Sequence, residues 1–131
     1  RKMSQTRRQL LKIENFEDIK SWQKARELTS KIYEITSSGG FSKDYGLRDQ
    51  IQRASVSIMA NIAEGFGADS NHEFIKFLNY SRRSATEVQS HLYVALDQEY
   101  ITQKQFNKIY KNLTNLKKLI NGFIKYLKKP E

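Results

Sequence analysis

Apolar residues recur at alternating steps of three and four through the C-terminal part of the chain, and this spacing constrains the fold more than any other feature. Residues three or four positions apart share one face of an α-helix. The pattern therefore predicts a long helix whose seam is buried in a left-handed bundle. The one proline, Pro130, lies beyond the pattern. The seam consists of Phe106, Ile109, Leu113, Leu116, Ile120, Phe123 and Leu127.

Three earlier segments show the same helical spacing of apolar residues. Ser70 followed by Glu73, and Thr102 followed by Gln105, are capping boxes, in which each side chain satisfies a free backbone N–H at the start of a helix. The second helix begins at residue 44 or at residue 47. The expected helices cover residues 19–36, 44–64, 70–97 and 102–127.

Glycine-containing segments separate the first three helices. The sequence SSGG at residues 37–40 is expected to end the first helix, because glycine adopts the left-handed conformation of a C-terminal cap. Gly65 and Gly67 are expected to stop the second helix. The connections at 37–43 and 65–69 are short enough to make neighbouring helices antiparallel. The predicted fold is all-α, a left-handed antiparallel up-down four-helix bundle.

The composition bounds the class of protein. The chain has 131 residues, of which 38% are hydrophobic and 28% charged, as in a soluble globular domain. We expect a flexible basic tail over residues 1–15 and the bundle domain over residues 16–129. No apolar run approaches the roughly 18–20 residues that a membrane-spanning helix needs, so no membrane contact is expected. The lack of cysteine excludes disulfides and thiolate metal sites and fits a cytoplasmic location.

The formal net charge of +9 is concentrated at the two ends of the chain. Residues 1–12 contain five basic side chains and no acidic one, and residues 102–131 contain eight lysines and one acid. Basic ends on a near-neutral middle indicate contact with a polyanion, RNA or DNA, although a solvated surface explains a lysine row equally simply. The candidate nucleic-acid-binding residues are Arg7, Arg8, Lys12, Lys104, Lys108, Lys111, Lys118, Lys125, Lys128 and Lys129.

A search for catalytic chemistry in the sequence is negative. Di-iron bundles need two Glu-x-x-His motifs, whereas His72 and His91 are the only histidines and Glu87 precedes His91 by four positions. The sequence GFG at 65–67 follows a helix and lacks the lysine of a phosphate-binding loop. We therefore predict a non-enzymatic protein without catalytic residues, metal site or cofactor.

A polar row interrupts the apolar second helix. Arg53, Ser57, Asn61 and Glu64 step by four, four and three positions and therefore share one face. The row is interpreted as a binding surface or as a structural hydrogen-bond network, and burial would require partners, because an unpaired buried charge is costly. Residues 54–63 are apolar on more than one side, which favours a subunit interface whose register the row fixes. The expected network consists of Gln50, Arg53, Ser57, Asn61, Glu64, Ser84 and Glu87.

Three segments carry a resemblance to a known family. FEDIKSWQKARELTSKIYE, YGLRDQIQRASVSIMANIAEGFG and SRRSATEVQSHL resemble the four-helix-bundle proteins associated with 23S rRNA intervening sequences. The most specific part is QIQRASVSIMANIAEG, and Arg83 departs from the pattern at a position where the family commonly has glycine. The positions that match the family pattern are Gln50, Arg53, Ser57, Asn61, Glu64, Gly65, Ser84 and Glu87.

The resemblance implies a bundle that assembles as a homopentamer. Relatives of this family include the accessory proteins of diversity-generating retroelements, which resemble basic pentamers that engage nucleic acid and a reverse transcriptase. The sequence thus supports two functions. The first is an oligomer that binds RNA or DNA through basic surfaces, and the second is a protein-interaction scaffold or accessory subunit for a nucleic-acid-processing enzyme.

Overall fold

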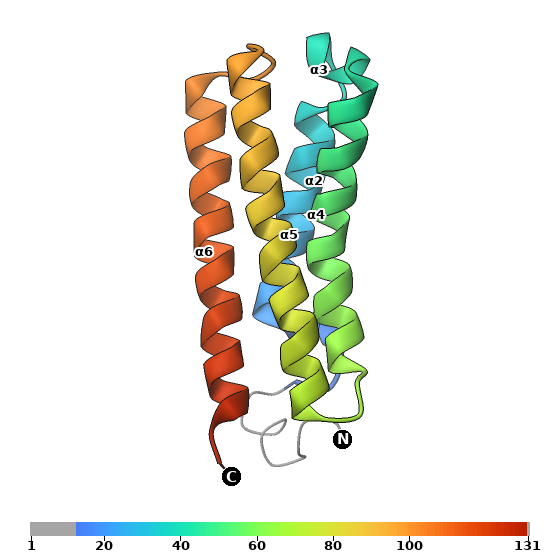
Figure 1. Cartoon of the computed structure of the whole chain (residues 1–131), viewed down its shortest axis with the longest axis vertical. Helices are drawn as coiled ribbons and strands as arrows, with labels where there is room; N and C mark the ends of the chain where they lie inside the picture. The colour runs from blue at the N-terminus through green and yellow to red at the C-terminus, as the bar shows by residue number, and fades with distance from the viewer. Residues whose placement is uncertain (1–12, 131) are drawn as a thin grey trace.

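The computed structural model describes residues 13–130, which form four long helices that run alternately up and down (Figure 1). A short 3-10 helix precedes the first long helix, and a five-residue helix lies in the first connection. The predicted all-helical bundle is confirmed. The elements are η1 (Phe16–Asp18), α2 (Lys20–Ile35), α3 (Gly39–Lys43), α4 (Tyr45–Phe66), α5 (Asn71–Asp97) and α6 (Gln103–Lys128).

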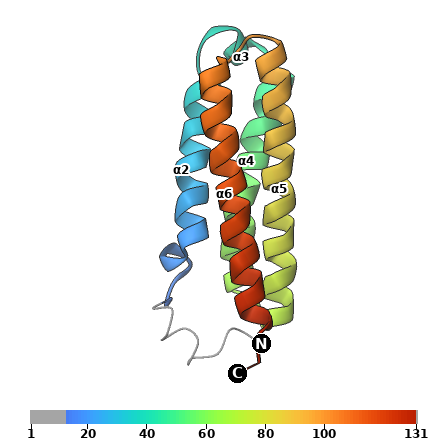
Figure 2. The ribbon, with the colours of Figure 1, turned by 90° about the vertical axis from the view of Figure 1, so that its left-hand side faces the viewer.

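The four long helices close a ring in the order α2, α4, α5, α6. Each helix packs on its two neighbours in this order, and the side view shows α6 between α2 and α5 (Figure 2). The contact between α4 and α5 is the most extensive, whereas that between α6 and α2 is the least. All four helices contribute to one hydrophobic core, so the bundle buries a single continuous interior.

The α6 seam has nearly the predicted composition. Every predicted seam residue is buried except Phe123, which is partly buried and packs its ring edge-on against Phe74 at 5.2 Å between centroids. Ile124, the next residue, is buried as well. The capping box that starts α6 is also as predicted, because the Gln105 amide donates to the Thr102 hydroxyl at 3.1 Å while the Thr102 amide donates to the Gln105 side chain at 2.8 Å.

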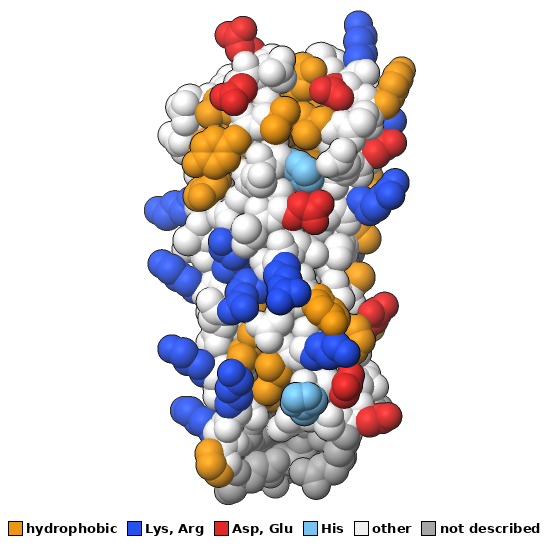
Figure 3. All heavy atoms as spheres, in the orientation of Figure 1, with side chains coloured by type: hydrophobic (Ala, Val, Ile, Leu, Met, Phe, Trp, Pro, Cys, Tyr) orange, Lys and Arg blue, Asp and Glu red, His pale blue; other side chains and the backbone are white. Residues whose placement is uncertain are grey.

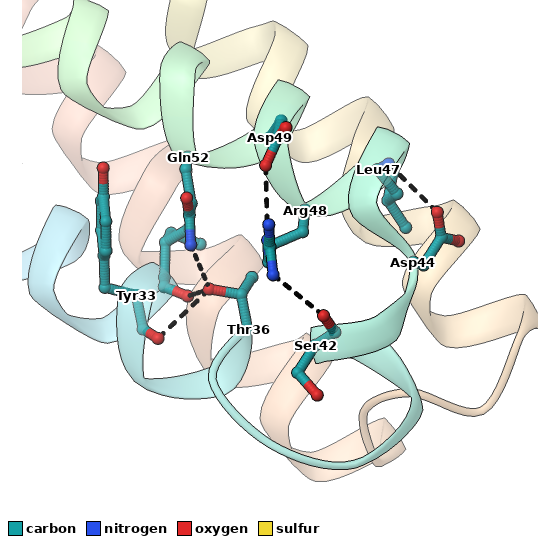
Figure 4. Close-up of polar contacts among 9 residues, drawn as sticks. Tyr33, Thr36, Ser42, Asp44, Leu47, Arg48, Asp49 and Gln52 are labelled. Carbon is teal, nitrogen blue, oxygen red and sulfur yellow. Dashed lines mark hydrogen bonds and ion pairs between the residues drawn. The ribbon is translucent and has the colours of Figure 1, made fainter.

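The connection between α2 and α4 differs from the predicted glycine-capped loop (Figure 4). The helix α2 ends at Ile35, and its C-cap is Thr36 in the right-handed conformation. The buried Thr36 hydroxyl donates to the Ile32 carbonyl at 2.8 Å and accepts from the Gln52 side chain at 2.9 Å. The predicted glycine cap is therefore wrong. The left-handed glycine is Gly39, with φ of 62°, and it begins α3.

Asp44 anchors the start of α4. Its carboxylate accepts from the Leu47 amide at 3.2 Å (Figure 4) and from the Tyr100 hydroxyl at 3.0 Å, which joins this corner to the connection between α5 and α6. The hydrogen bond to Asp44 raises the pKa of Tyr100. Arg48 donates to the Ser42 carbonyl at 3.0 Å and holds α3 against α4. The upper end of the bundle is therefore fixed by side chains.

Gly65 lies inside α4 and does not stop it, contrary to the prediction. The helix continues to Phe66 and is capped by Gly67 in the right-handed conformation. A Cβ atom on Gly65 would lie 2.8 Å from the Phe74 ring and 2.9 Å from the Cβ of Phe77. Residue 65 is a glycine because α5 leaves no room there for a side chain.

The structured part of the chain begins before the predicted boundary at residue 16. Ile13 is buried in the core, although the sequence analysis assigned it to the tail. The carboxylate of Asp18 accepts from the backbone amides of Glu14 and Asn15, both at 3.0 Å, and these bonds lower the pKa of Asp18. An isolated isoleucine has no periodic neighbours, which is why its burial was not predicted.

We predict that Gly65→Ala destabilises the protein by about 1–3 kcal/mol, because the added methyl group overpacks the contact with α5. Gly122→Ala is the matched control within α6, where a Cβ would meet nothing within 4 Å. Removing a helix-interior glycine there should stabilise by about 0.5–1 kcal/mol. Denaturant unfolding of both variants measures the two effects, and equal changes would refute the close approach.

Candidate nucleic-acid interface

Lysines dominate the exposed surface of α6. The helix carries seven lysines and no acidic residue, and the view of α5 and α6 shows basic side chains over both helices, with acidic ones mainly at the upper end and the right-hand edge (Figure 3). Lys125 and Lys128 occupy the last turn. Arg7, Arg8 and Lys12 lie outside the described residues. The predicted lysines that the structure exposes are Lys104, Lys108, Lys111, Lys118, Lys125, Lys128 and Lys129.

A set of side chains that sequence reasoning missed joins α5 to α6. Arg82 donates to the Asn121 side chain at 2.9 Å, and Lys117 donates to the Thr86 hydroxyl at 3.3 Å. Arg83, the residue that departs from the family pattern, is exposed beside Arg82. Arg82 and Arg83 extend the basic surface of α6 onto α5, and Lys117 of α6 reaches toward them.

The sequence does contain a signal for this set. Residues 82, 86, 89 and 93 step by four, three and four, and so do residues 110, 114, 117 and 121. When two such rows lie on antiparallel neighbouring helices, each residue of one row faces one residue of the other. Residues 82, 86, 89 and 93 therefore face residues 121, 117, 114 and 110, and each pair forms a rung. The structure shows these rungs as hydrogen bonds and ring contacts between α5 and α6. We call these eight residues the α5–α6 ladder.

The top rung of the α5–α6 ladder belongs to an aromatic cluster of Tyr93, Phe106 and Tyr110. The Tyr93 ring lies 4.9 Å from the Phe106 ring and 5.8 Å from the Tyr110 ring, centroid to centroid, and Phe106 and Tyr110 stack at 5.3 Å. Electrostatic repulsion from Tyr110, followed by desolvation, raises the pKa of Tyr93. Tyr93 therefore stays protonated and uncharged around neutral pH.

Acidic side chains are few beside the basic surface of α5 and α6, but two approach it: Glu87 is one turn from Arg83 along α5, and Glu27 on α2 lines a groove with Lys118. Glu87 contacts His91 at 3.3 Å and lines a groove beside α4 together with Arg53 and Ser57. Lysines on α2, in contrast, have acidic neighbours: Lys24 pairs with Glu27, and Lys31 pairs with Glu34.

Only some residues of the predicted polar network are hydrogen-bonded to one another. Ser57 is its centre, because the Asn61 side chain donates to the Ser57 hydroxyl at 3.0 Å and to its carbonyl at 2.8 Å. Ser84 on α5 donates to the same hydroxyl at 3.0 Å. These three half-buried residues join α4 to α5, and the buried Ser81 hydroxyl reinforces the contact by donating to the Ile58 carbonyl at 2.7 Å.

The charged and outer members of the row remain on the surface of the single chain. Gln50, Arg53, Glu64 and Glu87 are exposed. Arg53 and Glu64 are eleven residues apart, about 16 Å along the helix, so they cannot pair with each other. Within residues 13–130, neither forms an ion pair with another side chain. These four residues, which were expected to be buried, are therefore not buried within a single chain.

Between Ile13 and Pro130, no three His, Asp or Glu side chains gather in a way that would hold a metal ion. Over the same residues, none of the helices combines the length and apolar character needed to cross a bilayer.

Comparisons with known proteins agree with the fold. The model of the 23S rRNA-intervening sequence protein family matches residues 17–122. A crystal structure of a Bacteroides thetaiotaomicron protein of unknown function, from the S23 ribosomal protein family, is similar with a TM-score of 0.73 and 31% identity. The match covers 80% of this chain and 98% of that protein. A comparison with curated proteins gives no match.

We predict that Ser57→Ala destabilises the protein by about 1 kcal/mol, because the Asn61 and Ser84 side chains both lose their hydrogen bond to the Ser57 hydroxyl. Ser84→Ala should add little in the Ser57→Ala background, because the shared bond is already lost. Unfolding of the two single variants and the double variant tests this. Strictly additive changes in stability would contradict the network.

Proposed function

We propose that this chain, which belongs to the 23S rRNA-intervening sequence protein family, binds nucleic acid as a homo-oligomer through the basic surface of α6 and α5. RNA is the nucleic acid that the family name favours. Binding is electrostatic and directed at phosphates, so it reads little sequence. No catalytic step is part of the proposed function.

The observation that carries this proposal is the charge of α6. Seven lysines without an acidic residue on one helix produce a positive surface, and none of them forms an ion pair within residues 13–130. Lys104, Lys111, Lys118 and Lys125 are exposed and seven residues apart, so the row extends over about 32 Å. A duplex presents roughly one phosphate charge per 1.7 Å over that length.

Helix stabilisation accounts for only part of the lysine content. Lys125 and Lys128 in the last turn stabilise the negative end of the α6 macrodipole. Lys104, Lys108 and Lys111 lie in the first half of the helix, where positive charge gains nothing from the dipole. Their accumulation there favours an external anion.

The outer face of α4 supports the proposal of an oligomer. Val56 on α4 is 41% exposed and Tyr80 on α5 is 38% exposed, beside the unpaired Arg53 and Glu64. A second copy would cover the apolar side chains and supply opposite charges to both ends of the row. The family resemblance gives five as the expected number of subunits, and several copies would multiply weak phosphate contacts.

We predict that Lys111→Gln combined with Lys125→Gln weakens binding to duplex RNA and reduces the slope of log K against log salt by about two, because two phosphate contacts are lost. Fluorescence anisotropy with a labelled duplex at several salt concentrations measures both quantities.

The matched control combines Lys24→Gln with Lys31→Gln on α2, where each lysine already pairs with a glutamate. This variant changes the net charge by the same amount and should leave the slope unchanged. Equal losses in both double variants would show that overall charge, not α6, attracts the nucleic acid.

We predict that Val56→Glu lowers the native mass of the assembly, because the added carboxylate would be buried against a second copy. Leu119→Glu is the control, since Leu119 on α6 is 37% exposed and lies diagonally across the bundle from α4. Light scattering after size exclusion gives the subunit number. If the parent protein is a monomer, the proposed homo-oligomer is wrong. The exposed α4 face would then be available to a different protein, as expected for an accessory subunit.

A further inference from the structure

We propose that the α5–α6 ladder binds a single-stranded nucleic acid, with one base stacked on the ring of Tyr93 and neighbouring phosphates held by Lys117 and Arg82. This inference rests on the proposed nucleic-acid function, to which it adds the type of strand and a residue that contacts a base.

Tyr93 provides a stacking platform. Its side chain is 50% exposed on the α5–α6 surface, where hydrophobic side chains gather near the upper ends of both helices (Figure 3). Phe106 and Tyr110 lie against the ring and hold it in one position. A supported aromatic ring with an exposed surface is the element that single-strand-binding proteins use to stack bases, and it accepts any base because every base has a π-face.

The cations lie along the same face at regular distances from this ring. Thr86, the partner of Lys117, is seven residues from Tyr93, about 10 Å along α5, and Arg82 is eleven residues away, about 16 Å. The three positions follow one line because they are rungs of the α5–α6 ladder. A strand with a base on Tyr93 therefore passes Lys117 and then Arg82.

The ladder holds these groups before any ligand arrives. The buried Gln89 side chain donates to the Tyr110 carbonyl at 3.3 Å and to the Thr114 hydroxyl at 3.1 Å, which fixes the aromatic cluster on α5. Arg82 uses one N–H for Asn121, and a guanidinium carries five. The remaining donors are available to phosphate oxygens, and an ordered side chain loses less entropy on binding.

The charges around the ladder give the strand a direction. Between Tyr93 and Arg82 the only acidic residue is Glu87, which lines the groove beside α4. Asp97 is exposed one turn beyond Tyr93, at the upper end of the bundle. Asp97 repels phosphates at the upper end, whereas Lys117, Arg82 and Arg83 attract them on the other side of Tyr93. The strand therefore extends from Tyr93 toward Arg82 and Arg83.

A single strand fits this arrangement better than a duplex. In a duplex the base faces are already stacked on each other, so a surface tyrosine cannot stack on them. Unpaired bases in loops and ends are free to stack on aromatic side chains. The ladder therefore adds a preference for unpaired segments to the general phosphate affinity of α6.

The test compares Tyr93→Leu with Tyr33→Leu by anisotropy, using a labelled single-stranded oligouridine and a labelled RNA duplex. Tyr33 on α2 is 45% exposed and is the matched control. We expect Tyr93→Leu to weaken single-strand binding roughly 5- to 150-fold, the range for loss of one stacking aromatic, with duplex binding unchanged. Tyr33→Leu should change neither affinity.

Two further variants separate stacking from charge and from folding. Tyr93→Phe keeps the ring and should bind the single strand like the parent protein. Arg82→Gln should reduce the single-strand salt slope by about 0.7, whereas Tyr93→Leu should leave that slope unchanged. Leucine keeps an apolar contact with Phe106 and Tyr110, and an unchanged Tm confirms that the fold is intact.

The outcomes distinguish the two proposals. Binding of both nucleic acids with no effect of Tyr93→Leu would overturn the single-strand site and leave the proposed function standing. Failure of the parent protein to bind either nucleic acid at low salt would overturn both. An equal loss of single-strand and duplex affinity in Tyr93→Leu would also overturn the site, because it would indicate a general disturbance of the surface.

Discussion

The close approach of α4 and α5 is the constraint on which the rest of the structure depends. At Gly65 the two helices leave no space for a methyl group, because the ring of Phe74 and the Cβ of Phe77 occupy it. The buried Ser81 bonds the α4 backbone through Ile58, which is possible only when the helices are this close. This contact sets the rotation of α5 about its own axis. One side of α5 faces α4 with serines, and the adjacent side faces α6 with Arg82 and its ladder partners.

The rotation of α5 separates two surfaces of different chemistry. Toward α4 the surface combines Ser57, Ser84 and Glu87 with exposed apolar side chains, which suits contact with a second folded chain. Toward α6 it combines cations with a supported aromatic ring, which suits a flexible polyanion. Because the two surfaces lie on different sides of α5, an assembly through the first would leave the second accessible.

The four long helices were predicted well from the sequence, because the helical spacing of apolar residues is easy to recognise in long segments with few glycines and no internal proline. The sequence also predicted the α6 seam and the capping box at Thr102. It failed where tertiary contacts override local preference. Glycine is a typical helix-stop residue, yet the role of Gly65 depends on Phe74 and Phe77, which approach it only once α5 packs on α4. The α5–α6 ladder was missed for a related reason, since the basic residues were sought at the two ends of the chain and the matching row on α5 has meaning only once α5 and α6 are antiparallel neighbours.

Under the proposed function, the way the subunits assemble would also determine how far apart the nucleic-acid-binding sites lie. A site that holds one base and a few phosphates would bind weakly on each subunit. A strand that contacts several subunits would bind more tightly, because each further site is then at a high effective concentration. This gain requires that the spacing of the unpaired segments in the strand match the spacing of the sites in the assembly. In such an assembly the polar row on α4 would fix the register between copies, and α5 would carry that register to the position of Tyr93. The contact between subunits would then set the distance between neighbouring aromatic rings. A protein that reads almost no sequence would in this way select its nucleic acid by the spacing of unpaired bases.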